Sequence, residues 1–239
     1  MTSPHPKPPT LFFAGTDTDV GKTFVACMFA RLLRDRGHRV GIYKPVASGC
    51  RDENAIRIAD DAVALWNAAG RPGSIQRVCP QMFLAPLAPP AAAAQEGRQV
   101  DAERLFTEAS HWDDVCDALI IEGAGGLFSP LADGVLNIDL ARKFADAHLI
   151  IVAANRLGVI HQTLATIEAA RNRGRMPVGI VLCDPKGTAE PSTDTNASQI
   201  AAYTDVPIIG NVPYLTSTDA LSDVEAFVST KFIDELFMQ

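Results

Sequence analysis

Short apolar runs alternate with helical patterns along most of the chain. Residues 11–14 form the first run, and later runs span 39–43, 117–122, 147–153, 178–183 and 207–212. The later runs are rich in Ile, Val and Leu without polar alternation, which is typical of strands covered on both faces. Residues 23–36 and 159–173 follow the helical period instead. This order predicts an α/β fold: a doubly wound, mostly parallel sheet with helices on both faces.

The ends of the chain and its proline-rich stretches bear on domain organisation. Residues 1–9 are rich in proline and lack the apolar core of a signal peptide, so we expect a disordered lead-in. Residues 84–98 begin as a proline-broken loop, and 184–196 are also expected to be loop. Because no repeat or clear linker interrupts residues 10–239, they are expected to form a single domain.

Composition narrows the function classes. Of 239 residues, 47% are apolar, and the net charge is −7, which argues against the basic surface that nucleic-acid binding needs. Apolar runs fall short of the roughly 18 residues of a membrane span. The five cysteines are scattered without a Cys-x-x-Cys pair, so we expect reduced thiols in a cytoplasmic protein.

The most informative motif is Gly-Thr-Asp-Thr-Asp-Val-Gly-Lys-Thr at residues 15–23, between the first apolar run and a helical pattern. Such a strand–loop–helix turns backbone N–H groups and a helix N-terminus toward phosphate. Lys22 would reach the β- and γ-phosphates of ATP, and the Thr23 hydroxyl would bind Mg²⁺. Five residues separate Gly15 from the Gly-Lys pair, one more than in the usual phosphate loop.

Further charged residues come after the other predicted strands. Lys44 follows the second strand, where it is either a phosphate partner or an ordinary surface lysine. Glu122 closes the strand at 117–122 and either binds Mg²⁺ or forms a salt bridge at the sheet edge. Asp60 and Asp61 begin a helix, where acidic residues can be metal ligands or simply partners of the helix dipole.

Together these segments resemble the dethiobiotin synthetases, from about residue 11 to about 215. The matching segments are residues 15–23, Tyr-Lys-Pro-Val-Ala-Ser-Gly at 43–49, Gln-Glu-Gly at 95–97, Glu-Gly-Ala-Gly-Gly at 122–126 and Leu-Gly at 157–158. The longer phosphate loop is itself a mark of that family. The resemblance implies a mostly parallel sheet of about seven strands and a homodimer with a shared active site. It also implies that ATP and Mg²⁺ drive the carboxylation of 7,8-diaminopelargonate by CO₂ and the closure of a ureido ring.

The resemblance also implies a role for each matching residue. Lys22, Lys44 and Asp19 would be catalytic, and Thr23, Asp61 and Glu122 would bind Mg²⁺. ATP would be bound by Thr18, Asp19, Val20, Gly21, Lys22, Thr23, Cys183 and Pro213. The other substrate would be bound by Thr18, Lys44, Ser48, Gly123, Ala124, Gly125, Leu157, Gly158 and His161.

Two positions depart from the family pattern. His161 stands where the family usually has an Asn that holds the substrate's far carboxylate, and a protonated His could still donate to that group. Cys183 stands where an Asn usually reads the adenine edge, and a thiol is a weak hydrogen-bonding group. We therefore expect relaxed selectivity for the nucleobase.

Three alternatives share the predicted fold. A partitioning or switch-type ATPase usually carries a second lysine early in the loop, where this chain has residues 16–18, Thr-Asp-Thr. An amidating ligase for corrinoid substrates normally carries a glutaminase domain, for which 239 residues leave no room. A divergent paralogue acting on another substrate is suggested by His161 and Cys183.

Overall fold

A six-stranded parallel sheet organises the computed structural model, which describes residues 7–187, 190–215 and 226–237. The order across the sheet is β12-β11-β10-β1-β7-β2, and every neighbouring pair is parallel. The strands are β1 (Thr10–Gly15), β2 (Val40–Tyr43), β7 (Ala118–Gly126), β10 (His148–Ala154), β11 (Gly179–Cys183) and β12 (Ile208–Val212). The predicted fold class is confirmed, with six strands in the described sheet where the resemblance implied about seven.

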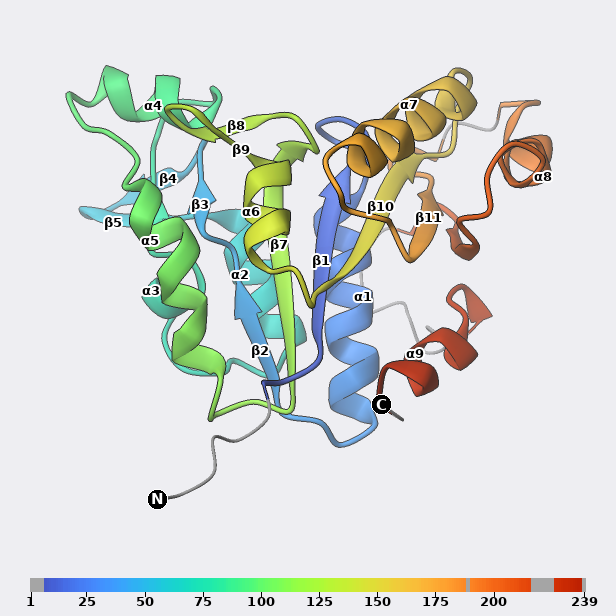
Figure 1. The fold of residues 1–239 in the computed structure, drawn as a ribbon. Coiled ribbons are helices and arrows are strands. Elements are labelled where there is room, and N and C mark those ends of the chain that lie inside the picture. The colour runs from blue at the N-terminus through green and yellow to red at the C-terminus, as the bar shows by residue number, and fades with distance from the viewer. Residues whose placement is uncertain (1–6, 188–189, 216–225, 238–239) are drawn as a thin grey trace.

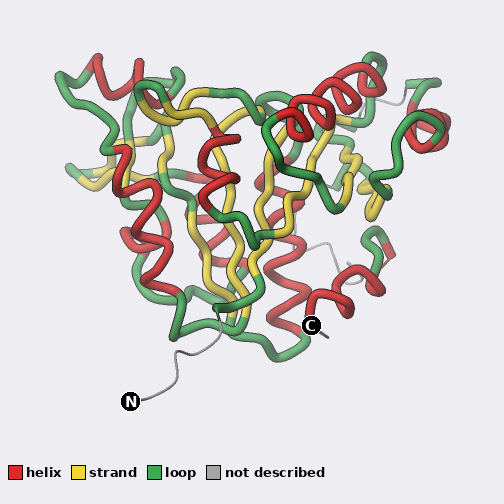
Figure 2. The backbone as a smooth tube through the Cα atoms, viewed as in Figure 1, coloured by secondary structure: helices red, strands yellow, loops and turns green. Residues whose placement is uncertain are grey.

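Helices cover both faces of this sheet, as Figures 1 and 2 show. Right-handed parallel crossovers place α1 on one face and α6, α7 and α8 on the other, because only the β1→β2 crossover runs in its direction across the sheet. α2 contacts α1 on its face, and α5 lies on the face of α6. The described helices are α1 (Lys22–Asp35), α2 (Asp60–Ala68), α3 (Ile75–Val78), α4 (Pro89–Gln95), α5 (Ala102–Thr107), the 3₁₀ helix η1 (Glu108–Trp112), α6 (Asn137–Lys143), α7 (Val159–Asn172), α8 (Thr193–Ala201) and α9 (Thr230–Phe237).

Three pairs of short strands lie outside the main sheet. They are β3 (Val46–Ala47) with β6 (Gln81–Met82), β4 (Arg51–Glu53) with β5 (Ile56–Ile58), and β8 (Pro130–Ala132) with β9 (Val135–Leu136). Each strand has two or three residues, which is too short for a period of two to be read from the sequence.

Two sequence-based expectations need correction. The stretch 184–196 is not loop to its end, because α8 begins at Thr193. The strand that contains Glu122 does not end there, because β7 continues to Gly126, which pairs with Gly15 of β1 after a shift in register. Glycines lack the β-branched side chains that mark a strand, and so the sequence pattern hid this extension.

The strand order changes direction at β1, and this places the site. From β1 the chain proceeds to β2 and then fills the position between them with β7, whereas β10, β11 and β12 follow in turn on the other side. Loops that leave on opposite sides of such a point open a crevice at the carboxyl ends of the strands. Beneath that edge the core is closely packed, as shown by the buried rings of Phe13 and Phe29, whose centroids lie 5.2 Å apart.

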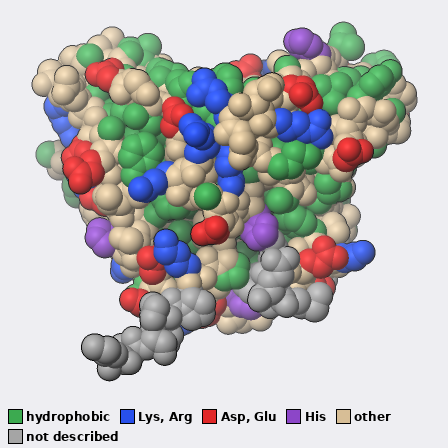
Figure 3. All heavy atoms as spheres, in the orientation of Figure 1, with side chains coloured by type: hydrophobic (Ala, Val, Ile, Leu, Met, Phe, Trp, Pro, Cys, Tyr) green, Lys and Arg blue, Asp and Glu red, His purple; other side chains and the backbone are tan. Residues whose placement is uncertain are grey.

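The predicted lead-in of residues 1–9 falls mostly outside the described residues, which begin at Lys7. Among the helices that the structure describes, none combines the length and apolarity needed to cross a bilayer. All five cysteines lie in the described ranges and are buried with free thiols. Acidic and basic side chains are interspersed on the face seen in Figure 3.

Candidate functional site

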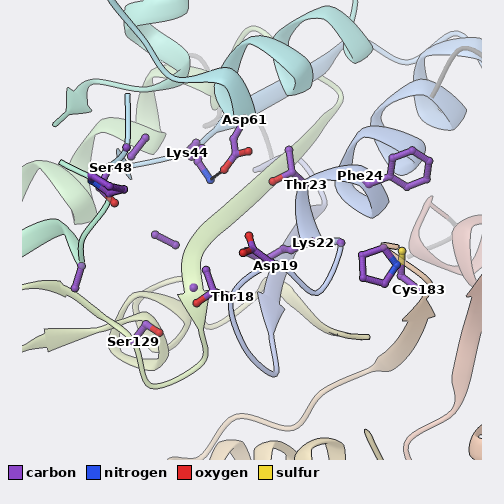
Figure 4. A pocket seen from close by; sticks show the side chains of 18 of the residues that line it. Thr18, Asp19, Lys22, Thr23, Phe24, Lys44, Ser48, Asp61, Ser129 and Cys183 are labelled. Atoms are coloured by element: carbon purple, nitrogen blue, oxygen red, sulfur yellow. Dashed lines mark ion pairs between the residues drawn. The ribbon is translucent and has the colours of Figure 1, made fainter. Parts of the chain in front are cut away.

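A cavity of about 920 Å³ opens at the carboxyl edge of the sheet. The loops after β1, β2, β7 and β11 all contribute to its wall, together with the start of α2 and the segment before α4 (Figure 4). It brings together most of the residues that the sequence singled out: Thr18, Asp19, Gly21, Lys22, Thr23, Lys44, Ser48, Asp61, Ala124, Gly125 and Cys183.

The loop of residues 16–21 has the shape of an anion cradle. Gly21 adopts a φ of 87°, which a glycine tolerates best, and caps the N-terminus of α1. Asp19 also has a positive φ, of 55°. A Cβ on Gly15 would lie 2.5 Å from the Asp17 carbonyl oxygen, so the first turn of the loop requires glycine. The helix N-terminus and the turned backbone suit a phosphate group.

A cluster of charges lies beside this loop. The Nζ of Lys44 is 2.6 Å from Oε1 of Glu122 and 3.2 Å from Oδ2 of Asp61. The Thr23 hydroxyl donates to the same Oε1 over 2.9 Å. Glu122 is fully buried and Lys44 nearly so, whereas the Asp61 side chain is 56% exposed toward the cavity. Figure 4 shows Lys44 and Asp61 pointing toward each other.

Burial and neighbouring charges oppose each other in this cluster. Burial alone would lower the pKa of Lys44, but Glu122 and Asp61 hold it above its ordinary value. The Lys44 ammonium lowers the pKa of the Asp61 carboxyl, although burial acts in the other direction. The pKa of Lys22 is lowered, chiefly because burial disfavours its charge, against the pull of Glu122. Lys44 is therefore a cation and Asp61 an anion at neutral pH.

The donor set fits a magnesium ion that is shared with phosphate. Oε2 of Glu122 is buried without a hydrogen-bond partner among the described residues, and the Thr23 hydroxyl and Asp61 carboxylate lie nearby. Carboxylate and hydroxyl oxygens are the ligands that Mg²⁺ prefers. Within the described ranges, His, Cys, Asp and Glu form no group of three or more that could hold a metal by themselves. Phosphate oxygens and water would have to complete the coordination.

Asp60 and Asp61, which the sequence could not separate on physical grounds, take different places. Asp60 forms an ion pair with Arg51 over 2.7 Å, and it does not line the cavity. Asp61 lines the cavity and faces Lys44. Both residues are in the first turn of α2, but consecutive side chains of a helix point in different directions, so only Asp61 faces the cavity.

Several predicted residues lie apart from the cavity wall. Val20 is buried beneath the loop and Pro213 is exposed, whereas Gly123 is covered by the side chain of Asn137. Another group (Leu157, Gly158 and His161) sits exposed at the start of α7. This chain alone does not bring that group to the cavity.

The far end of the cavity has a different character. Cys183 is buried, and its sulfur would lie 2.6 Å from a Cβ on Gly21, so the thiol packs against the phosphate loop. Burial raises the pKa of Cys183 to about 12, which keeps it a neutral thiol. Asp184 accepts hydrogen bonds from the backbone N–H groups of Lys186 and Gly187. The ring of Tyr214, which is 48% exposed, also lines this end.

The cavity wall also contains residues that were not among the predicted site residues, and Phe24, Ser129 and Tyr214 are three of them. Ser129 has no recognisable motif of its own, and Phe24 reads as an ordinary apolar position of α1. For Ser129 the signal was its closeness to the glycine run of residues 123–126.

Comparisons with known proteins agree with this geometry. Residues 9–222 match a family model described as an AAA domain. The ATP-dependent dethiobiotin synthetase of Rhodopirellula baltica is 44% identical over 211 residues, covering 84% of this chain and 82% of the relative. The proteins of the same description from Idiomarina loihiensis and Bacillus licheniformis are 34% and 37% identical, covering 86% and 85% of this chain and 93% and 85% of the relatives.

Solved structures support the fold. Two structures of the signal recognition particle receptor FtsY from Elizabethkingia anophelis, one in complex with GDP, superpose with TM-scores of 0.52 and 0.55 at 17% and 16% identity. They cover 99% and 100% of this chain, which spans 68% and 66% of the length of those receptor chains. At such low identity the likeness concerns the fold alone.

The buried charge cluster yields a stability prediction. Lys44→Ala leaves the fully buried Glu122 without its cation, so we expect the free energy of unfolding to fall by about 3–5 kcal/mol. The double variant Lys44→Met with Glu122→Gln removes both charges and should recover most of this loss. Urea unfolding of the nucleotide-free protein at neutral pH measures both.

Lys143→Ala serves as the control, because Lys143 is exposed at the end of α6. Its effect should stay within about 0.5 kcal/mol. A Lys44→Ala protein as stable as this control would show that the buried pair does not stabilise the fold.

Proposed function

Because this chain belongs to the family of ATP-dependent dethiobiotin synthetases, which are ligases that form C–N bonds, we propose that it carboxylates 7,8-diaminopelargonate with CO₂ and closes the ureido ring. The observation that carries the proposal is the meeting of two lysines, Lys22 and Lys44, with Thr23 and Asp61 in one cavity beside a phosphate loop. The buried Glu122 lies directly behind this wall, in contact with Lys44 and Thr23. Such an array suits transfer of a phosphoryl group to an anionic acceptor.

The reaction proceeds through two activated species. One amine of the substrate takes up CO₂ and loses a proton to give a carbamate. A carbamate oxygen attacks the γ-phosphorus of ATP, the bond to the β-phosphate oxygen breaks, and ADP leaves. The second amine then attacks the carbonyl carbon of the resulting carbamic–phosphoric anhydride. Phosphate departs, a further proton is lost, and the five-membered ureido ring closes.

The chain's own residues supply position and charge for these steps. Lys22 and Lys44 both line the cavity, where they would neutralise the γ-phosphate and the carbamate. Thr18 and Ser48 would orient the reacting end of the substrate, and Asp19 would act from the phosphate loop. Thr23, Asp61 and Glu122 would hold Mg²⁺, which when bound neutralises charge on the phosphates. No covalent nucleophile is needed, because proximity and charge neutralisation suffice.

A homodimer would explain the residues that stand apart. Leu157 is 81% exposed, and Gly158 and His161 are exposed beside it at the start of α7. An apolar side chain so exposed next to a predicted carboxylate-binding group is suited to meet a second copy of the chain. In that arrangement the segment of residues 157–161 would hold the far carboxylate of a substrate bound by the other subunit. A cytoplasmic location stays a prediction from the cysteine pattern.

ADP release from purified protein, supplied with ATP, Mg²⁺ and bicarbonate, tests the proposed function. Adding 7,8-diaminopelargonate should stimulate release strongly, and mass spectrometry should detect a product that is heavier by one carbonyl group in place of two hydrogens. ATP binding without stimulation by the diamine would contradict the proposal. That result would favour a switch-type ATPase or a paralogue acting on another substrate.

Cys183, which stands where the family usually has an Asn that reads the adenine edge, gives a prediction on nucleotide choice. Because the Cys183 thiol packs against Gly21 and is a poor hydrogen-bonding group, CTP and GTP should support turnover within about tenfold of ATP. Cys183→Asn should raise the ratio of kcat/KM for ATP to kcat/KM for CTP or GTP. Cys183→Ala should leave this ratio unchanged. A wild-type protein that rejects CTP and GTP by several hundredfold would show that another group reads the base.

A further inference from the structure

Asn137 stands out as a buried polar residue that sequence reasoning did not identify. It is the first residue of α6 and is 1% exposed. It does not line the cavity, but lies behind the glycine-rich end of β7, which does. A carboxamide in such a place calls for an explanation, since buried polar groups are retained where their hydrogen bonds are needed.

The carboxamide of Asn137 holds two carbonyl groups of that glycine-rich segment. Its Nδ2 donates to the carbonyl oxygens of Ala124 and Gly126, the second over 2.7 Å. Both partners are acceptors, so the NH₂ end of the side chain is the end that must face them. Its backbone N–H also donates to the carbonyl oxygen of Ser129 over 3.0 Å. The Ser129 hydroxyl in turn accepts from the N–H of Gly126 over 2.9 Å.

This arrangement fixes the direction of one peptide group. In a planar trans peptide the C=O and the following N–H point in opposite directions. With the Ala124 carbonyl turned toward Asn137, the N–H of Gly125 points away from the Asn137 carboxamide, and both Ala124 and Gly125 line the cavity. Gly125 has a φ of 71°, and a Cβ there would lie 2.6 Å from the Ser129 hydroxyl oxygen. Asn137 therefore holds the carbonyl of this peptide, and the Ser129 hydroxyl holds the N–H of the peptide that follows.

The Asn137 side chain also has an unfavourable feature, a buried oxygen without a hydrogen-bond donor in the described part of the chain, which indicates that its other contacts are needed. Oδ1 of Asn137 is buried without a hydrogen-bond partner among the described residues. It would lie 2.2 Å from a Cβ on Gly123, so this position of β7 must be glycine while Asn137 is present. An apolar residue would avoid the unpaired oxygen, but would leave the Ala124 and Gly126 carbonyls without these donors.

We propose that Asn137 is a positioning residue, which aims the N–H of Gly125 at the anionic oxygen of the group that becomes phosphorylated. The inference rests on the proposed function, because it assigns a carbamate oxygen as the partner. A fixed N–H donor is most useful where negative charge must be held in a set position during reaction. Gly125 also lies near the phosphate loop, since a Cβ there would be 4.0 Å from the Thr18 hydroxyl oxygen.

The test compares Asn137→Ala with a matched buried amide, Gln81→Ala. Gln81 is 4% exposed and bonds the backbone of Asp101 twice, over 3.0 and 2.8 Å, away from the cavity wall. Diamine-dependent kcat, the KM for ATP and the melting temperature are measured for both variants. We expect both to melt at lower temperature. Asn137→Ala alone should lose about 100-fold in kcat with an almost unchanged KM for ATP.

Asn137→Ser keeps one donor and should give an intermediate kcat. If the alanine variant does not fold, this serine variant takes its place in the comparison. Unchanged kcat in a folded Asn137 variant would overturn the inference and leave Asn137 a structural residue. A raised KM for ATP with unchanged kcat would also overturn it.

If the wild-type protein shows no diamine-dependent turnover, the proposed function fails. The variants are then compared in basal ATP hydrolysis, where rates equal to the wild type overturn the inference.

Discussion

A buried lysine and a buried glutamate, with 2.6 Å between Nζ of Lys44 and Oε1 of Glu122, constrain the rest of this structure. Each charge would be very costly to bury alone, so neither residue can occupy its place without the other. Their strands are neighbours, with Tyr43 at the end of β2 paired to Ile121 of β7. Lys44 and Glu122 are the next residues along the chain after these two. The order of the central strands and the charge cluster therefore depend on each other.

The same registry joins the cluster to the phosphate loop. Phe13 of β1 pairs with Glu122 on the other side of β7, and the loop of residues 16–21 starts just beyond the end of β1. Thr23, in the first turn of α1, thereby reaches the Glu122 carboxylate. The glycine-rich end of β7, held by Asn137, forms the opposite wall. A single crevice in the sheet thus gathers a phosphate cradle, paired charges and a fixed backbone donor.

Sequence reasoning reached much of this arrangement because the relevant signals were local. The phosphate loop, Lys44 and Glu122 each follow an apolar strand directly, and parallel strands end at one edge. The pairing of Lys44 with Glu122 was not foreseen, because the sequence does not give the position of β2 beside β7. Asn137 was missed because its partners, Ala124 and Gly126, lie 13 and 11 residues away and are backbone atoms. Leu157 and His161, which were predicted to bind the substrate, do not line the cavity of this chain.

In the proposed reaction a carbamate oxygen attacks the γ-phosphorus of ATP within this cavity. Bicarbonate labelled with ¹⁸O tests it most directly, in a quenched reaction shorter than the exchange of bicarbonate with water. We expect released phosphate to carry one ¹⁸O atom from bicarbonate for each ring closed, because phosphate leaves with the oxygen that attacked. Phosphate free of the label, formed together with the ureido product, would contradict it.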